Sequence, residues 1–431
     1  MAAPVVFLIA LVTTVIIDAS TAAVGEWLPE FQWTSETFGG YEPLIRTSAT
    51  NPSLVFVGGY TRNHSDWGSK AIFAFNATTG NVSWVTEVDP VQKSIKWILS
   101  TALGAQSIAN GSIFYMHPEY RANSNCSTFS AYDENTGREE WSYTMPHAYT
   151  DGSIRMIEQP IYHDGLLYQL IVDCKEKRLN LTVHSATNGS VLENKGPLRD
   201  QYGDYVRHHC RPLAPHHDMY QHILVLSSLS GLYTIDVRTW NTTKIFASYP
   251  SHFYLCQRTG NVYFNIGVAF AYNVVTGELV WKADLPADAV KLVDYESNGV
   301  YMWTGPPGNN SCFSVIKADL HTGAYLWNWT WPESIFYSID ASVYLAMGPN
   351  STLLVNFIPA RRDHPSDSLT PKLCGIDFTT GEQKYCVTSI ASNHSGLPTI
   401  GPPVLHGDRL FIPWALNNWL RVSGFEFKKV H

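Results

Sequence analysis

The densest group of potential metal ligands is a histidine-rich stretch near the middle of the chain. It begins at His208, His209 and Cys210. Its second half consists of His216, His217, Asp218 and His222. Imidazole and thiolate groups are the usual ligands of zinc. About five strand residues of about 3.3 Å each separate the two halves, so one ion cannot contact both. We therefore expect no metal site and interpret these histidines as residues of turns and of a channel rim.

The longest expected loop carries a compact charged group, Arg361, Arg362, Asp363 and His364. A solvated loop is one interpretation. Recognition of an anionic ligand is the other, because the arginine fork matches carboxylates and phosphates. Two further carboxylates, Asp173 and Asp340, lie near expected strand ends but belong to no catalytic motif. We therefore assign no catalytic and no cofactor-binding residue.

The beginning of the chain is typical of a secretory signal. An apolar run covers residues 5–17, and the small residues that follow fit cleavage near Ala22 or Ala23. An uncleaved anchor is the alternative, but the run is short for a bilayer span of about 20 residues. We expect residues 1–23 to be a signal peptide and residues 24–431 to form one secreted or lumenal domain without a transmembrane segment.

Acceptor motifs for N-glycosylation, Asn-x-Ser/Thr, agree with export from a eukaryotic cell. They start at Asn63, Asn76, Asn81, Asn110, Asn125, Asn180, Asn188, Asn241, Asn309, Asn328, Asn350 and Asn393. The net charge is −8 with only 15% charged residues, and Lys and Arg are scattered. This charge distribution argues against nucleic-acid binding.

One hairpin motif recurs along the chain and decides the fold. It consists of an alternating apolar strand, a polar turn ending in Thr-Gly, and a second strand that carries Trp. The clearest copies place Gly and Trp at 80 and 84, 137 and 141, 277 and 281, and 323 and 327. Weaker copies end at Gly189, Asn241 and Gly381. The glycine allows a positive φ, an Asp or Asn bonds the turn, and the Trp is expected to pack between sheets.

A second pair of strands precedes each hairpin, so each repeat supplies the four strands of a propeller blade. Seven hairpins are explicit. The C-terminal segment 402–427 supplies three strands without a fourth, and the segment around Trp27 reads as a lone outer strand. Joining these ends closes an eighth blade and removes the open edges. The sequence predicts an all-β, eight-bladed propeller of four-stranded antiparallel blades, with seven blades as the alternative.

The Ala-x-Asp-x-x-Thr-Gly-x-x-x-Trp hairpin resembles the PQQ-like repeat of the quinoprotein alcohol dehydrogenase-like family over nearly all of the mature chain. A kelch-like or other propeller is the alternative. The family contains quinoprotein dehydrogenases and non-catalytic scaffolds such as the bacterial outer-membrane assembly lipoprotein, so the resemblance does not imply one activity. Its larger dehydrogenases use PQQ with calcium and a vicinal cysteine pair, but this chain has no adjacent cysteines and no CxxCH motif. We predict a non-catalytic binding or scaffold glycoprotein; a PQQ- and calcium-dependent oxidoreductase, or one with another redox ligand, is the alternative.

The two faces of a propeller differ in their connections. If the strands of a blade are lettered A to D from the axis outward, the A–B and C–D turns lie on one face and the B–C and D–A connections on the other. Six acceptors are expected on the turn face: Asn76, Asn81, Asn188, Asn241, Asn110 and Asn350. The longer loops are expected on the opposite face, at 61–70, 119–128, 305–310 and 360–372. We therefore predict the functional surface on the B–C/D–A face.

Seven cysteines in an exported chain predict disulfides with one thiol left over. The absence of a CxxC motif argues against zinc and thioredoxin-type chemistry. The expected blade positions suggest three pairs and one free thiol: Cys374–Cys386, Cys126–Cys174, Cys210–Cys256, and Cys312 alone.

Overall fold

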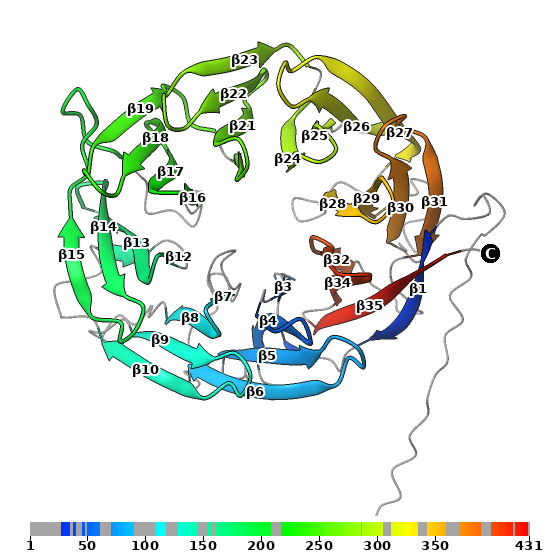
Figure 1. Ribbon diagram of the computed structural model, residues 1–431, viewed down its shortest axis with the longest axis horizontal. Helices are drawn as coiled ribbons and strands as arrows, with labels where there is room; N and C mark the ends of the chain where they lie inside the picture. The colour runs from blue at the N-terminus through cyan, green and yellow to red at the C-terminus, as the bar shows by residue number, and fades with distance from the viewer. Residues whose placement is uncertain are drawn as a thin grey trace, which may run out of the picture.

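The computed structural model describes residues 27–34, 38–39, 45–47, 50–60, 70–89, 108–117, 128–144, 154–156, 160–173, 175–207, 217–250, 252–285, 287–304, 312–334, 343–358, 371–388, 398–416 and 419–429. The regular elements in these ranges are all β-strands, and they form an eight-bladed propeller around a central axis (Figure 1). This architecture confirms the predicted all-β fold and the blade count. Within the same ranges no helix is long and apolar enough to cross a membrane.

The blades follow each other in chain order, and the strands of blades 1 to 7 run in sequence from the axis outward. Blade 1 contains β3 (Ile45–Thr47), β4 (Leu54–Tyr60), β5 (Lys70–Asn76) and β6 (Val82–Asp89), and blade 2 contains β7 (Ile108–Ala109), β8 (Ser112–His117), β9 (Thr128–Asp133) and β10 (Glu139–Thr144). Blade 3 contains β11 (Ile154–Met156), β12 (Ile161–His163), β13 (Leu166–Asp173), β14 (Arg178–Ser185) and β15 (Val191–Lys195), and blade 4 contains β16 (His217–Tyr220), β17 (Ile223–Ser228), β18 (Gly231–Asp236) and β19 (Thr242–Phe246).

The second half of the ring repeats this plan. Blade 5 contains β20 (Tyr254–Cys256), β21 (Asn261–Asn265), β22 (Ala269–Asn273) and β23 (Leu279–Ala283), and blade 6 contains β24 (Ala289–Asp294), β25 (Gly299–Thr304), β26 (Cys312–Asp319) and β27 (Tyr325–Ser334). Blade 7 contains β28 (Tyr344–Gly348), β29 (Thr352–Phe357), β30 (Lys372–Asp377) and β31 (Gln383–Thr388), and blade 8 contains β32 (Pro398–Ile400), β33 (Val404–His406), β34 (Arg409–Leu416), β35 (Trp419–Lys429) and, as its outermost strand, β1 (Trp27–Thr34).

Blade 8 is shared by the two ends of the chain, as predicted. Strand β1 pairs with β35 in antiparallel register from Trp27 opposite Lys429 to Thr34 opposite Ser423. The short strand β2 (Phe38–Gly39) then pairs with both β35 and β4, which joins blades 8 and 1 into one ten-stranded sheet. The first described strand therefore closes the ring (Figure 1).

Tryptophans of the repeat motif connect four of the blades to the blade that follows. The indole Nε1 donates to a backbone carbonyl of the following blade in four cases: Trp84 to Glu134 (3.1 Å), Trp141 to Ala186 (3.0 Å), Trp281 to Leu320 (3.0 Å) and Trp327 to Phe378 (3.0 Å). The ring also packs on the turn glycine of that blade. Gly381 has a φ of 79°, and a Cβ on it would lie 2.8 Å from the Trp327 ring. These glycines are thus needed both for the turn and for the contact between blades.

The cysteine predictions have different outcomes. Cys374 and Cys386 lie opposite each other on β30 and β31 and form a disulfide, as predicted. Cys256 is a buried free thiol, so its predicted bridge to Cys210 is wrong. Its side chain packs in the apolar cluster between blades 5 and 6 rather than toward another cysteine. The predicted Cys126–Cys174 pair lies outside the described residues, as does Cys210.

A buried histidine occupies a core position in blade 3. His184 is the penultimate residue of β14 and is fully buried, with its ring edge-on to Phe129 at 5.3 Å. Its Nδ1 lies 3.0 Å from the carbonyl oxygen of Gly189, which can only accept, so Nδ1 carries the proton. Its Nε2 is buried without a hydrogen-bond partner. Burial therefore lowers the pKa of His184.

This histidine predicts a pH dependence of stability. A lowered pKa in the folded state means that the neutral ring stabilises the fold above pH 6.5, the ordinary histidine pKa, and that stability is lost as the pH falls toward the folded value. Between pH 7 and about pH 5, the free energy of unfolding should fall less for the His184→Phe variant than for the wild type. Phe75 occupies the equivalent penultimate position of β5, so the ring is compatible with a blade core. Urea unfolding of both proteins at several pH values tests this prediction. If their free energies of unfolding change in parallel with pH, the prediction is wrong.

A candidate ligand-binding channel

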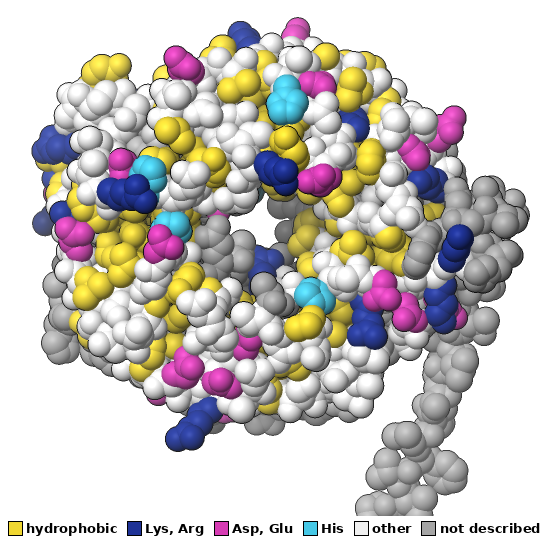
Figure 2. All heavy atoms as spheres, viewed as in Figure 1, with side chains coloured by type: hydrophobic (Ala, Val, Ile, Leu, Met, Phe, Trp, Pro, Cys, Tyr) yellow, Lys and Arg dark blue, Asp and Glu magenta, His cyan; other side chains and the backbone are white. Residues whose placement is uncertain are grey.

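The innermost strands of the eight blades border an opening along the axis of the propeller. Figure 2 shows this opening as a hollow at the centre of one face, with both basic and acidic side chains near its edge. Each innermost strand runs from a D–A connection toward an A–B turn, so its first residues lie nearer the B–C/D–A face. Most B–C and D–A connections lie outside the described residues, so the strands are the part of the channel wall that the structure describes.

Strand register places three polar side chains of this lining at one level. Arg46 on β3 pairs with the third residue of β4, and Tyr254 on β20 pairs with the third residue of β21. Lys291 is the bulge residue of β24. It precedes Leu292, which pairs with Tyr301, the third residue of β25. The second strand of each blade begins at its A–B turn, so equal positions on these strands correspond to equal heights along the axis.

Both cationic groups of this level are held in partly dry surroundings. Arg46 Nη1 donates to the carbonyl of Ile45 at 2.9 Å. The Lys291 Nζ lies 5.5 Å from the centroid of the Trp303 ring, near the end of β25 that leads into the B–C connection. Burial lowers the pKa of both Arg46 and Lys291. Loss of water raises the free energy of a cation, and an anion bound beside it would offset that cost.

Tyrosines supply neutral hydrogen-bond donors on neighbouring innermost strands. Tyr254 and Tyr344 are the first residues of β20 and β28, on either side of the strand that carries Lys291. Burial raises the pKa of Tyr254 to about 12, and the nearby Tyr344 adds to this shift. Tyr254 therefore keeps its hydroxyl proton at neutral pH. Guanidinium, ammonium and hydroxyl groups are donors that bind carboxylate or phosphate oxygens.

The histidine-rich stretch lies only partly in the described chain. His217 and Asp218 are on β16, and one carboxylate oxygen of Asp218 accepts from the N–H of Met219 at 2.8 Å. His222 Nε2 lies 3.9 Å from the Asp236 carboxylate, away from this strand. Outside the described residues are His208, His209, Cys210 and His216. Among the residues that are described, no three His, Cys, Asp or Glu side chains gather in a metal-binding group.

The other candidate residues do not join the channel in the described structure. The charged loop 361–364 and Asp340 lie outside the described residues. Asp173 ends β13, and one of its carboxylate oxygens accepts from the N–H groups of Lys175 and Glu176, both at 3.0 Å. These bonds make Asp173 a turn cap rather than a free acid.

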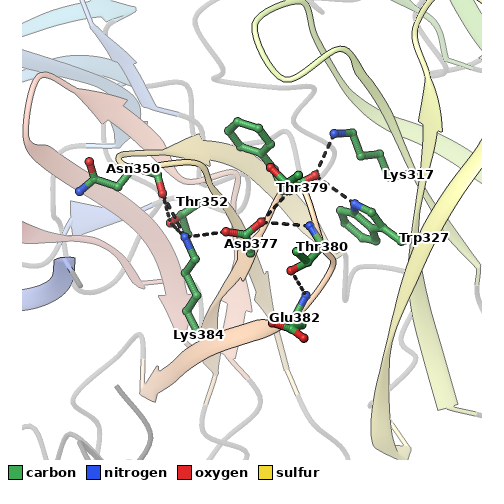
Figure 3. A network of polar contacts seen from close by, with 10 residues as sticks. Lys317, Trp327, Asn350, Thr352, Asp377, Thr379, Thr380, Glu382 and Lys384 are labelled. Carbon is green, nitrogen blue, oxygen red and sulfur yellow. Dashed lines mark hydrogen bonds and ion pairs between the residues drawn. The ribbon is translucent and has the colours of Figure 1, made fainter. Parts of the chain in front are cut away.

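A buried lysine between blades 6 and 7 was not anticipated from the sequence. Lys317 on β26 is only 4% exposed, and its Nζ donates to the carbonyls of Ser297 and Phe378, both at 2.8 Å. Beside it, Lys384 forms an ion pair of 3.0 Å with the turn carboxylate of Asp377 (Figure 3). Because the contacts of Lys317 are to backbone atoms on the turn side, we interpret it as a connection between blades and not as part of the channel.

The glycosylation acceptors differ in exposure. The exposed ones are Asn81, Asn110, Asn188, Asn241, Asn328 and Asn350. Asn76 and Asn180 are half-buried. The remaining four, Asn63, Asn125, Asn309 and Asn393, lie outside the described residues. Of the six acceptors assigned to turns, five lie in C–D or A–B turns and Asn76 is the last residue of β5, so the exposed acceptors are concentrated on the turn face and the outer strands.

Comparison with known proteins shows similarity to solved structures of the same fold and no match by sequence. No protein-family model matches the sequence, and no curated protein matches it. The structure is similar to the quinohemoprotein alcohol dehydrogenase from Comamonas testosteroni, with a TM-score of 0.56, 10% identity and coverage of 95% of this chain and 77% of that one. It is also similar to a europium-containing methanol dehydrogenase, with a TM-score of 0.53, 10% identity and coverage of 95% and 94%. At such identities the likeness shows a quinoprotein-like propeller fold alone.

Proposed function

We propose that this chain is an exported, non-catalytic binding glycoprotein with a propeller of the PQQ-like repeat family, and that its B–C/D–A face and channel bind an anionic ligand. The observation that carries the proposal is the level that Arg46, Lys291 and Tyr254 form on the innermost strands of the channel. Cations that have lost part of their water shell favour ligands that bring negative charge.

Export is proposed from the sequence and is supported by the position of the acceptors. The apolar run at residues 5–17 fits a signal peptide, and six of the acceptor asparagines are exposed on the turn face or the outer strands. Glycans at these six positions would occupy the turn face and the outer strands, whereas Asn63, Asn125 and Asn309 lie in loops expected on the opposite face. The concentration of exposed acceptors on the turn face and the outer strands favours a ligand that approaches from the B–C/D–A side.

The alternative function is an oxidoreductase that uses PQQ with calcium, and the fold similarity to two quinoprotein dehydrogenases favours it. Calcium in proteins takes six to eight oxygen ligands, several of them carboxylates. The described part of the channel wall does not supply such a set, because no three acidic, histidine or cysteine side chains come together there. The described residues therefore fit an organic anion better than a calcium ion, and we derive no redox step.

One experiment separates the two functions. The purified protein is mixed with PQQ, with and without calcium, and followed by quinone absorbance and by dye reduction in the presence of alcohols or sugars. We expect no substrate-dependent dye reduction, and no calcium requirement for any change in absorbance. Turnover that depends on calcium would overturn the proposal and establish the oxidoreductase.

A further inference from the structure

Among the described residues, no further strand pairs with the outer edge of any blade, and these outermost strands differ in polarity. Blades 2 and 7 expose charged or polar residues there, such as Glu139, Glu140 and Gln383. Blades 1, 3, 5 and 6 instead expose apolar side chains. These are Val82 and Val85 on β6, Val191 and Leu192 on β15, Leu279 and Val280 on β23, and Tyr325 and Leu326 on β27. An exposed apolar edge strand is a template for pairing with other chains.

Three of these four apolar strands have an acceptor asparagine beside the apolar side chains. Asn81 directly precedes Val82, and Asn188 lies three residues before Val191. Both asparagines are exposed in the turn that leads into the outer strand. A glycan on either one would therefore start within a few residues of the apolar edge.

The third acceptor lies within the outer strand itself. Along β27, Leu326, Asn328 and Thr330 are exposed, while Trp327 and Trp329 alternate with them and are buried. The hydroxyl of Tyr325, whose ring is 51% exposed, donates to Asn328 Oδ1 at 2.9 Å. This contact leaves the amide nitrogen, where a glycan is attached, directed away from the tyrosine hydroxyl. That nitrogen donates to Thr330 Oγ1 at 3.4 Å, so the first sugar would start on the exposed face that Leu326, Asn328 and Thr330 share.

We propose that N-linked glycans on Asn81, Asn188 and Asn328 cover the apolar outer strands β6, β15 and β27 and prevent these edges from pairing with other chains. The proposal rests on the proposed export, because glycosylation requires it. Strand β23 exposes Leu279 and Val280 without a neighbouring acceptor, so it stays bare and contributes equally to every variant below.

The chain provides a matched control for this proposal. Asn81 and Asn241 follow the same kind of turn, and their backbone N–H groups donate to Thr79 and Thr239 at 3.3 and 3.4 Å. Asn241 is followed by two threonines and not by exposed valines. Loss of its glycan removes the same mass and polarity but uncovers no apolar strand.

The test compares glycan removal at these positions in protein made by a secretory host. Peptide mass spectrometry establishes occupancy, and light scattering with dye binding to apolar surface reports self-association. We expect the triple variant Asn81→Gln, Asn188→Gln and Asn328→Gln to bind several-fold more dye than the wild type and to self-associate. The single variant Asn81→Gln should show a smaller increase in both. Asn241→Gln should match the wild type. Enzymatic removal of glycans from folded wild-type protein should reproduce the triple variant, even if that variant is not secreted.

Two outcomes would overturn the proposal in distinguishable ways. If the three sites are occupied and deglycosylated protein remains as monomeric as the wild type, the covering role is wrong and export is unaffected. If the wild-type protein is not exported and carries no glycan at any site, the proposed export and this inference both fail.

Discussion

Removing residues 27–34, strand β1, is expected to lower the free energy of unfolding by at least about 4 kcal/mol, since each lost intramolecular hydrogen bond contributes about 1 kcal/mol. The strand is paired with β35 over seven register positions and completes blade 8. Without it, β35 becomes the open outer edge of blade 8. Chemical denaturation of a chain that begins at Ser35, compared with one that begins at Gly25, measures the difference.

Addition in trans provides the control for this truncation. A synthetic peptide with residues 25–34 should restore most of the lost stability, because it can add to the same edge of β35. A peptide of the same composition in scrambled order should not. If the truncated chain unfolds at the same denaturant concentration as the full chain, ring closure does not stabilise the propeller.

Replacing the tryptophan that connects blades 6 and 7 is expected to have the second largest effect. Trp327→Ala removes a ring that is only 8% exposed and leaves a cavity, which costs about 3–5 kcal/mol for an aromatic residue. Trp327→Phe keeps most of the packing but loses the 3.0 Å bond to Phe378, which costs about 1 kcal/mol. Thermal and urea unfolding of the two variants separate packing from hydrogen bonding.

A double-mutant cycle tests whether the turn glycine and the ring act together. Gly381→Ala introduces a Cβ within 2.8 Å of the Trp327 ring and forces a side chain onto a φ of 79°. In the Trp327→Ala background only the backbone cost of about 1–2 kcal/mol should remain. If Gly381→Ala costs the same in both backgrounds, the glycine is required by the turn alone.

The fold was predictable because the same hairpin signals recur in successive copies of the repeat. Each Thr-Gly turn, capping Asp or Asn and following Trp reports one hairpin, and the unmatched strand around Trp27 reports the closure. The disulfide between Cys374 and Cys386 followed from their places on one hairpin. The error at Cys256 arose because strand position does not determine the direction of a side chain, and this thiol points into the apolar cluster between blades.

The candidate site was much less predictable from the sequence. Arg46 and Lys291 are single cations in apolar segments far apart along the chain, and only ring closure brings β3 and β24 to one channel. Lys291 also lies on a bulge, which alternation along the strand does not reveal. A lone lysine in an innermost strand was the available signal. The histidine-rich stretch is the more visible signal in the sequence because its residues are adjacent.

The most direct test of the anionic channel is a calcium-free titration with PQQ, a coloured tricarboxylate, followed by its absorbance. The wild type should bind it saturably, and Lys291→Met should weaken binding by at least about tenfold, since a charge-assisted hydrogen bond contributes about 1.5–3 kcal/mol. Lys282→Met, an exposed lysine of the outer strand β23, serves as the matched control and should bind as the wild type does. Equal dissociation constants for the wild type and Lys291→Met, or no saturable binding by the wild type, would contradict the account.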